Sequence, residues 1–306
     1  MALNIIFMGT PKFAVPVLDS IFNSNHKILE VYTQPPKKKN RGQKTNISPI
    51  HKYCNDNGIK VNHPANLNND DEYNNIKKLN PDLIIVVAYG KILPENILNI
   101  KKDKFINIHA SLLPKWRGAA PIHRAIMNMD KETGVSIMQI VPKLDSGPVL
   151  MTSKVKINPD TNYEDLSKEL SILSSKMILQ SIELIERNQA QFVNQDESKA
   201  TYAKKIKKEE SKINWKESAK KIISKINALY PFPGSWFNYK GARIKITKAK
   251  EVNMSGKVGE ILSTKFIVGC RENAVQILEL QKEGKKTINV NEYLKGNPLI
   301  VGDLLE

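Results

Sequence analysis

The chain opens with the sequence LNIIFMGTPKFAVPVLDSIF, residues 3–22. Its first five residues form an apolar run, which breaks at Gly9-Thr10-Pro11 and is followed by apolar residues at helical spacing up to Phe22. This pattern predicts a strand, a turn and a helix in succession. The turn lacks the GxGxxG spacing of dinucleotide-binding folds, so we do not expect a nicotinamide cofactor.

The alternation of strands and helices continues along the first half of the chain. Further apolar strands are predicted at 28–33, 83–87, 105–109, 135–140 and 149–157. Ser48-Pro49 predicts the start of one helix, and the capping box Thr161-Asn162-Tyr163-Glu164 predicts the start of a long helix that ends near Glu186. Strands that alternate with helices predict a doubly wound, mostly parallel α/β sheet, in which ligands bind at the carboxyl ends of the strands.

The pattern changes in the second half of the chain. A helix at 218–229 is followed by short alternating runs at 235–239, 242–249, 259–263, 266–270 and 275–280. These runs predict a small antiparallel β-barrel or sandwich. We therefore expect a first domain at 1–189, a basic and polar linker at 190–208, and a second domain at 209–306.

The composition sets limits on the class of protein. With 41% hydrophobic and 25% charged residues, collagen-like, coiled-coil and wholly disordered classes are excluded. The 47 Lys and Arg residues exceed the 31 Asp and Glu residues by 16, so a polyanionic partner is expected. Cys54 and Cys270 lie far apart and are expected to be buried thiols in a reducing compartment. No apolar run approaches the ~20 residues of a membrane span, and the chain start carries no basic leader, so we expect a cytoplasmic protein.

Polar side chains gather where the predicted strand at 105–109 ends. Residues two apart in a strand project from the same face, so we expect Asn107 and His109 to point to the same side. Asp145 follows another predicted strand, and we expect its carboxylate to reach the same edge and orient His109. An amide donor beside an imidazole suits a developing oxyanion. Two of these residues also have a structural interpretation, His109 as a strand-end residue and Asp145 as a turn former.

One motif joins these candidates. It reads Asn107-Ile108-His109, followed by Ser111-Leu112-Leu113-Pro114, with Asp145 downstream. In this motif the chain resembles the folate-dependent formyltransferases. Further segments, at 7–14, 86–90, 113–122, 202–206 and 231–236, are similar to the branch of that family that acts on charged initiator tRNA. The resemblance covers nearly the full chain and implies a Rossmann-like formyltransferase domain followed by a small OB-like β-barrel that binds tRNA.

The resemblance also implies a reaction and its residues. A formyl group would move from 10-formyltetrahydrofolate to the α-amino group of methionine esterified to initiator tRNA, without a metal, in a monomeric enzyme of translation initiation. Asn107 and His109 would stabilise the oxyanion, and Asp145 would hold His109 charged and help to move the proton of the amine. The residues expected to bind the folate are Ser111, Leu112, Leu113, Pro114, Val87, Ala88, Tyr89, Gly90 and Val141. The segment 86–90 is at the same time expected to be a buried central strand.

Two basic segments are candidates for contact with tRNA. The loop between Pro35 and Pro49 holds five basic residues and no acidic one, namely Lys37, Lys38, Lys39, Arg41 and Lys44. It is either a solvated surface loop or, as the resemblance implies, a loop that enters the acceptor stem. The stretch 199–225 contains ten Lys and three Glu, and its expected tRNA contacts are Lys204, Lys205, Lys207 and Lys208.

Two other functions remain as alternatives. A formyltransferase of a small amine, such as glycinamide ribonucleotide or an amino sugar nucleotide, would carry the same three catalytic residues, but it would not need the basic segments. A non-catalytic RNA-binding protein would need the basic segments, but it would not need Asn107, His109 and Asp145 together.

Overall fold

The computed structural model describes residues 2–39 and 44–305. The chain divides into two compact units, each of which is interrupted in sequence. The first combines the chain up to Gly118 with Gly134–Val155 and Ser167–Tyr202, and the second combines Ala119–Thr133, Lys156–Leu166 and the chain from Ala203. Helix α5 (Pro121–Met127) therefore belongs with the C-terminal part of the chain, where it packs against α7 (Ala219–Leu229).

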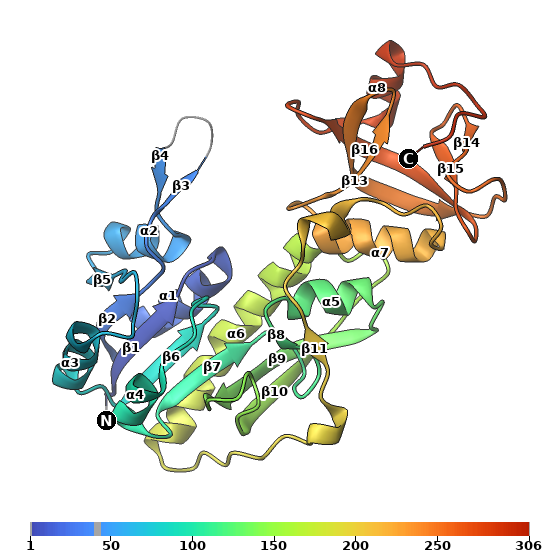
Figure 1. The fold of residues 1–306 in the computed structure, drawn as a ribbon. Helices are drawn as coiled ribbons and strands as arrows, with labels where there is room; N and C mark the ends of the chain where they lie inside the picture. Colours follow the sequence, from blue (N-terminus) through green and yellow to red (C-terminus); the bar gives the residue numbers. More distant parts are fainter. Residues whose placement is uncertain (1, 40–43, 306) are drawn as a thin grey trace. The chain divides into compact units, whose positions relative to one another are not determined.

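The first unit is built on a seven-stranded sheet with the order β10-β9-β7-β6-β1-β2-β5 (Figure 1). The strands are β1 Asn4–Gly9, β2 Lys27–Tyr32, β5 Val61–Asn62, β6 Leu83–Val87, β7 Phe105–His109, β9 Glu132–Gln139 and β10 Val149–Lys156. Strands β7, β6, β1, β2 and β5 run parallel, whereas β9 runs antiparallel to β7. The mostly parallel α/β sheet predicted from the sequence is confirmed.

Helices connect the strands of this sheet. They are α1 Val15–Phe22, α2 Pro49–Asp56, α3 Asp70–Leu79, α4 Glu95–Leu98 and α6 Tyr163–Glu186, with 3₁₀ turns at Lys12–Ala14, Asn99–Lys101 and Glu197–Lys199. The predicted start of α2 is confirmed, because Ser48 Oγ accepts a hydrogen bond from the His51 N–H at 3.0 Å. Helix α3 was not predicted, since it buries one apolar side chain, Ile76, and shows little periodicity. Within the described ranges, no helix has the length and apolar character that crossing a membrane requires.

Burial on both faces explains the continuous apolar runs of the central strands. All five residues of β6 are buried, as are five of the six residues of β1. One face carries a core cluster to which Ile6, Met8, Tyr32, Ile84, Val86, Tyr89 and Phe105 belong. A parallel sheet covered on both sides has no polar face, so its strands lack the alternation of antiparallel ones.

The start of α6 differs from the prediction. The N-terminal cap is Asn162 rather than Thr161, because Asn162 Oδ1 accepts a hydrogen bond from the Asp165 N–H at 3.0 Å. Thr161 Oγ1 instead accepts from the Asn158 N–H at 2.9 Å. Asparagine is preferred over threonine at this position, so residue type favours Asn162, whereas the spacing of Thr161 and Glu164 had favoured Thr161.

The basic loop that follows β2 contains regular structure. Strands β3 (Lys37–Lys39) and β4 (Lys44–Asn46) form an antiparallel pair with Lys38 opposite Thr45. Arg41 lies outside the described residues. At the base of this segment the hydroxyls of Thr33 and Ser48 are hydrogen-bonded at 2.7 Å. The segment leaves the sheet at the carboxyl end of β2, the edge at which β7 also ends.

The second unit contains an antiparallel sheet with the path β12-β13-β16-β15-β14 and β17 paired with β16. Its elements are α7, β12 Ser235–Tyr239, β13 Ala242–Val252, β14 Ile261–Ser263, β15 Ile267–Gly269, β16 Ala274–Lys282, β17 Ile288–Asn289 and α8 Val290–Gly296. The predicted turn at Lys240-Gly241 is confirmed, with φ of +47° and +73°. Phe237, Ile244, Phe266 and Val275 pack in its core with α7 and α8. This arrangement is consistent with the predicted small barrel.

Both cysteines are buried free thiols, as predicted. Burial raises the pKa of the Cys270 thiol to about 11.

A stacked pair of rings in the second unit makes its stability sensitive to acid. His123 of α5 stacks on Tyr163 with ring centroids 4.0 Å apart. Burial, with a smaller contribution from Arg124, lowers the pKa of His123 to about 4. The His123 imidazole therefore binds a proton more readily in the unfolded chain than in the folded protein. The stability that the neutral ring provides is lost as the pH falls from about 6.5 towards 4.

We expect His123→Phe to reduce this acid sensitivity, because phenylalanine keeps a ring on Tyr163 but cannot be protonated. Between pH 7 and pH 5 the parent should lose on the order of 1–2 kcal/mol more stability than the variant. Thermal melts of both proteins at the two pH values measure this difference. Equal losses of Tm in parent and variant would show that His123 is not the source of the acid sensitivity.

Candidate active site

Strand β7 places Asn107 and His109 on one face of the sheet. Its register pairs Asn107 with Val86 of β6, and strand alternation sets Phe105, Asn107 and His109 on the same side. The Asn107 side chain is half-buried, and its amide has no hydrogen-bond partner in the part of the chain that the structure describes. This amide is therefore available to a bound group.

His109 is buried, with a hydrogen-bond partner at one ring nitrogen and a carboxylate near the other. Its Nε2 lies 2.8 Å from the carbonyl oxygen of Trp116, and its Nδ1 lies 3.7 Å from Oδ2 of Asp145. Because a carbonyl only accepts hydrogen bonds, Nε2 carries a hydrogen, and Nδ1 faces the carboxylate. A second proton on the ring would therefore meet a negatively charged acceptor.

Asp145 reaches His109 by a different route from the one predicted. Because β9 is antiparallel to β7, the chain leaves β9 at the start of β7, where the Ile140 N–H donates to the Phe105 carbonyl at 2.8 Å. That point is about 13 Å from His109 along the strand. The loop 140–148 must fold back along the sheet to bring Asp145 to the carboxyl end.

Two features of this loop fix its path. Asp145 has a left-handed backbone with φ of +46°, and its Oδ2 accepts a hydrogen bond from the Gly118 N–H at 2.7 Å. Gly147 packs so closely that a Cβ there would lie 1.8 Å from the carbonyl oxygen of Gln139. The path of the loop therefore requires a glycine at position 147 and the hydrogen bond that the Gly118 N–H donates to the Asp145 carboxylate.

The segment after β7 supplies apolar walls near His109. Leu112, Leu113 and Pro114 are half-buried. Ser111 is fully buried, and its hydroxyl donates to the Lys115 carbonyl at 2.6 Å. Ser111 thus stabilises the turn, while the three residues that follow it can contact a ligand.

The end of β6 can offer main-chain groups to a ligand. The side chains of Val87 and Tyr89 are buried, and Tyr89 belongs to the core cluster. Its hydroxyl has no hydrogen-bond partner among the residues that the structure describes. Ala88 and Gly90 are exposed, with φ of +47° and +80°. Val141 is half-buried, and its N–H has no protein partner in the described ranges. Of the residues assigned to the folate, Tyr89 and Val87 can therefore contribute main-chain contacts, and Ser111 has its hydroxyl already bonded.

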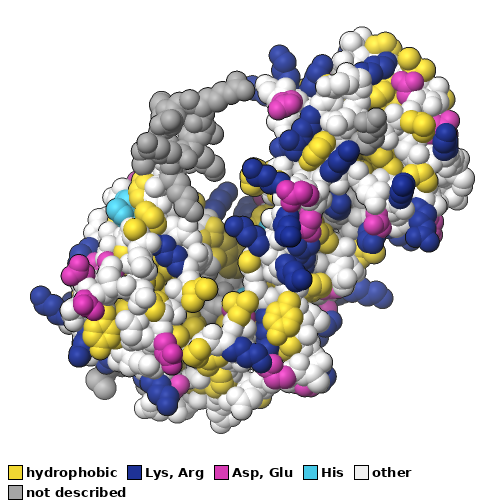
Figure 2. Space-filling model, in the orientation of Figure 1, with side chains coloured by type: hydrophobic (Ala, Val, Ile, Leu, Met, Phe, Trp, Pro, Cys, Tyr) yellow, Lys and Arg dark blue, Asp and Glu magenta, His cyan; other side chains and the backbone are white. Residues whose placement is uncertain are grey.

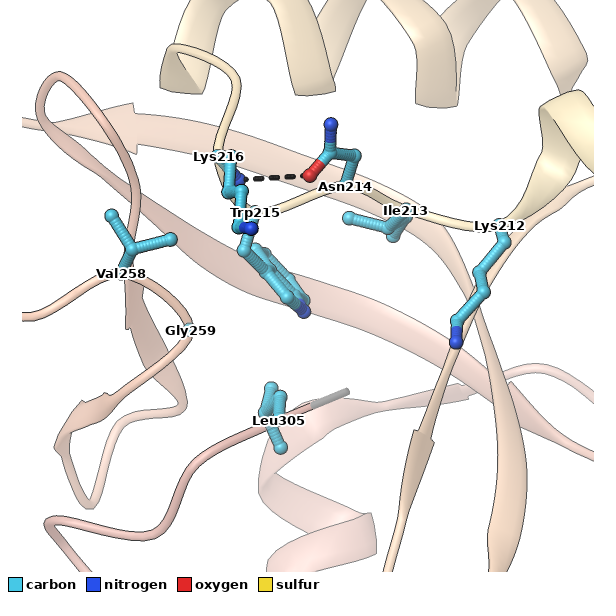
Figure 3. Close-up of a pocket in the computed structure, with 8 residues that line it drawn as sticks. All are labelled: Lys212, Ile213, Asn214, Trp215, Lys216, Val258, Gly259 and Leu305. Carbon is cyan, nitrogen blue, oxygen red and sulfur yellow. Dashed lines mark hydrogen bonds between the residues drawn. The ribbon is translucent and has the colours of Figure 1, made fainter.

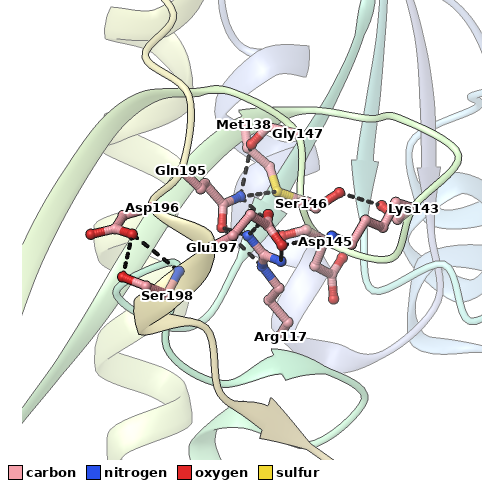
Figure 4. A network of polar contacts seen from close by, with 10 residues as sticks. All are labelled: Arg117, Met138, Lys143, Asp145, Ser146, Gly147, Gln195, Asp196, Glu197 and Ser198. Carbon is pink, nitrogen blue, oxygen red and sulfur yellow. Dashed lines mark hydrogen bonds and ion pairs between the residues drawn. The ribbon is translucent and has the colours of Figure 1, made fainter.

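A buried arginine joins the loop 140–148 to a distant segment (Figure 4). Arg117 of β8 (Arg117–Gly118) is 0% exposed, and its guanidinium donates to Gln195 and Glu197 at distances from 2.8 to 3.2 Å. Glu197 also pairs with Lys143 at 2.6 Å. Hydrogen bonds from Arg117 and Lys143 lower the pKa of the Glu197 carboxyl to about 2. Gln195 and Glu197, which lie in the predicted linker, thus belong to the first unit.

The lysines predicted to contact tRNA in the second unit are exposed, namely Lys204, Lys205, Lys207 and Lys208. Arg124 fixes the backbone of their segment, since its guanidinium donates to the Lys204 carbonyl at 3.0 Å and pairs with Glu210 at 2.6 Å. Figure 2 shows Lys and Arg side chains spread over the visible face of the second unit, where acidic side chains are fewer. This surface suits a polyanion.

A pocket of about 420 Å³ lies in the second unit (Figure 3). It is lined by Lys212, Ile213, Asn214, Trp215, Lys216, Val258, Gly259 and Leu305. It contains none of the residues predicted to form the active site.

Comparison with protein families decides the affiliation of the chain. The family model described as formyl transferase matches residues 3–182, and the model of the formyl transferase C-terminal domain matches residues 205–298. The chain belongs to the formyl transferase family.

The relatives of this formyl transferase extend over its full length. Proteins named methionyl-tRNA formyltransferase from Pelagibacter ubique and Parvibaculum lavamentivorans are 50% and 39% identical to it, covering 99% and 98% of the chain and 98% and 99% of the relatives. HypX from Aquifex aeolicus in complex with tetrahydrofolic acid has a TM-score of 0.68 at 18% identity, with the chain spanning 51% of HypX. WlaRD, a sugar 3N-formyl transferase, has a TM-score of 0.68 at 22% identity, over 94% of this chain and 100% of its own. These two structures support the fold.

Sequence reasoning missed Arg117, Gln195 and Glu197 in this formyl transferase. Arg117 lies inside the motif at 113–122, so the motif offered a signal, but nothing in its composition indicates that the arginine is buried. Gln195 and Glu197 lie in a polar stretch without periodicity, which is typical of linkers.

We expect Gly147→Ala to destabilise this formyl transferase, because the added Cβ collides with the Gln139 carbonyl and the loop must move. The expected loss in the free energy of unfolding is about 1–3 kcal/mol. The matched control is Gly296→Ala, where a Cβ has no atom within 4 Å. Urea denaturation of both variants measures the difference. Equal midpoints would contradict the close packing of Gly147 on the Gln139 carbonyl.

Proposed function

We propose that the chain transfers the formyl group of 10-formyltetrahydrofolate to the α-amino group of methionyl initiator tRNA. The observation that carries this proposal is the meeting of Asn107, His109 and Asp145 at one end of β7, in a chain 50% identical over its full length to a methionyl-tRNA formyltransferase. The product would be N-formylmethionyl-tRNA for translation initiation. The expected form is a cytoplasmic monomer, with the domains at 1–189 and 209–306 joined by 190–208.

The chemistry assigns a role to each of the three residues. The amine attacks the formyl carbon, a new C–N bond forms, and the formyl oxygen becomes an oxyanion. The Asn107 amide donates a hydrogen bond to this oxyanion, and the positive charge of a protonated His109 stabilises it electrostatically. Asp145, 3.7 Å from His109, accompanies the charged ring and accepts the proton that the amine loses. Collapse of the intermediate breaks the bond between the carbon and N10 of the folate, which takes up a proton.

The residues around His109 fit a folate donor. A pteridine ring is flat and has hydrogen-bonding groups along its edge, so its site needs apolar walls and main-chain donors and acceptors. Leu112, Leu113 and Pro114 offer half-buried apolar surface, and Val141 offers an N–H that has no partner in the described part of the chain. Ala88 and Gly90 are exposed at the end of β6. The main chain of 141–144 is the proposed partner of the pteridine edge.

The basic segments fit a tRNA acceptor. The β3–β4 segment follows the carboxyl end of β2, and β2 stands three strand positions from β7, or about 14 Å, at the same edge of the sheet. We assign Lys37, Lys38, Lys39, Arg41 and Lys44 of this segment to the acceptor stem. The exposed Lys204, Lys205, Lys207 and Lys208 provide further phosphate contacts.

A formylation assay tests the reaction and its residues together. The purified protein should formylate methionyl initiator tRNA with 10-formyltetrahydrofolate, and free methionine and an amino sugar nucleotide should be poor acceptors. Replacing Asn107, His109 or Asp145 by Ala should lower turnover by on the order of a hundredfold. Asn107 and His109 stabilise the developing charge, and Asp145 holds His109 and accepts the proton of the amine. Asp160→Ala, which removes an exposed carboxylate, is the matched control. Normal turnover by His109→Ala would refute the assignment of the active site. Preferred formylation of the amino sugar nucleotide would refute the assignment of methionyl initiator tRNA as the acceptor.

Replacing Lys37, Lys38, Lys39 and Arg41 by Ala tests the basic segment. Formylation of charged tRNA should fall strongly, and the slope of log affinity against log salt should flatten by roughly one unit for each lost phosphate contact. The affinity for tetrahydrofolate should stay within twofold of the parent.

The matched control replaces the exposed Lys77, Lys78, Lys102 and Lys104, which precede β6 and β7 and so stand at the opposite edge of the sheet. If both quadruple variants formylate equally well, the segment between β2 and α2 is solvated surface.

A further inference from the structure

We propose that Arg117 and Gln195 form a positioning pair that holds the Asp145 loop against His109 for the formyl transfer. The inference rests on the proposed function, and it assigns a role in that function to a segment that its composition had marked as a linker. Neither residue contacts the reacting atoms in this proposal. They act through the backbone of the loop 140–148.

The charged member of the pair, Arg117, is fully buried. The Arg117 side chain has no exposed surface, and four of its N–H groups have acceptors. Nε and Nη2 donate to Gln195 Oε1 at 3.0 and 2.8 Å, and Nη1 and Nη2 donate to the two carboxylate oxygens of Glu197 at 3.2 and 2.8 Å. A buried guanidinium with this many fixed donors determines where residues 195–197 lie.

Gln195 connects Arg117 to the backbone of the loop 140–148. Its Oε1 is occupied by Arg117, which leaves its Nε2 to donate in the opposite direction. Nε2 donates to the carbonyl of Asp145 at 3.0 Å and to the carbonyl of Gly147 at 2.7 Å. One amide thus clamps the backbone on both sides of Ser146. The orientation of this amide is fixed because Arg117 can only donate and the two carbonyls can only accept.

The backbone of the loop 140–148 needs such contacts to keep its conformation. Asp145 holds a left-handed backbone, which is unfavourable for a residue with a Cβ, and the loop folds back about 13 Å from its exit at the start of β7. The second contact to Asp145 comes from Gly118, whose N–H binds the carboxylate at 2.7 Å. Gly118 follows Arg117 directly, so β8 holds the backbone of Asp145 through Gln195 and its carboxylate through Gly118.

The same short segment also contacts His109. The Trp116 carbonyl lies 2.8 Å from His109 Nε2. Residues 116–118 therefore touch both members of the His109–Asp145 pair, and the buried Arg117 side chain anchors the segment between them. A displacement of this anchor would change the distance between the two groups.

Gln195→Glu separates positioning from stability. A glutamate keeps the acceptor for Arg117 and adds a charge to the pair, so the buried guanidinium stays satisfied. It replaces the amide donor with a carboxylate oxygen, which repels the carbonyls of Asp145 and Gly147. We expect kcat for formylation to fall roughly 10- to 100-fold, as for a small misplacement of catalytic groups. The KM for methionyl-tRNA, the affinity for tetrahydrofolate and the Tm should change little.

Two further variants complete the test. Gln195→Leu removes both the acceptor and the donors, and it should lower kcat as much as Gln195→Glu does while also lowering the Tm. Asp196→Asn is the matched control, because Asp196 lies between the two partners of Arg117 but binds Ser198, and asparagine keeps that cap. Its kcat should equal that of the parent.

An NMR measurement tests the positioning without the reaction. The ring ¹⁵N signals of His109, assigned by comparison with His109→Gln, should shift in Gln195→Glu and stay in place in Asp196→Asn. Unchanged ring signals, or a kcat for Gln195→Glu within twofold of the parent, overturn the positioning role. If the parent itself does not formylate methionyl-tRNA, the proposed function fails, while the ring signals still decide whether Gln195 positions Asp145 against His109.

Discussion

The arrangement around Asn107, His109 and Asp145 depends on one constraint, the burial of the Arg117 guanidinium. A charge removed from water is tolerated only when its hydrogen-bond donors find acceptors, and the side chain of Arg117 has no exposed surface. Its acceptors, Gln195 and Glu197, lie 78 and 80 residues further along the chain. The stretch that contains them is polar and has little periodicity, yet it packs within the first unit because the arginine requires its oxygens.

This constraint links the two functions of the short segment 116–118. The Trp116 carbonyl orients the ring of His109, and the Gly118 N–H orients the carboxylate of Asp145. The side chain between them is inaccessible and fully engaged, so the segment cannot rotate without breaking several charge-assisted hydrogen bonds at once. The buried, hydrogen-bonded guanidinium thus keeps the segment rigid, and this rigidity fixes the distance between His109 and Asp145 at the edge of the sheet.

The mixed direction of the sheet explains why such support is needed. In a purely parallel sheet, a residue that follows a neighbouring strand would arrive at the carboxyl edge directly. Here β9 is antiparallel to β7, so its loop leaves from the opposite end and returns along the sheet. Gly147, packed against the Gln139 carbonyl, permits the close approach, and a left-handed Asp145 turns its carboxylate back to His109. The site is the product of a long loop that several distant groups hold in place.

The amino-acid sequence by itself determined the local elements. Strands β6 and β7 have the bounds that their apolar runs predict, α2 begins at Ser48-Pro49, and alternation along β7 sets Asn107 and His109 on one face. These features depend on residues a few positions apart, which is the range over which periodicity and capping act. Only the tertiary structure decided the direction of β9, the burial of Tyr89 in the core and the pairing of Arg117 with Gln195. Each depends on groups far apart in the chain, whose meeting follows from how the buried surfaces and charges are satisfied together rather than from any local pattern.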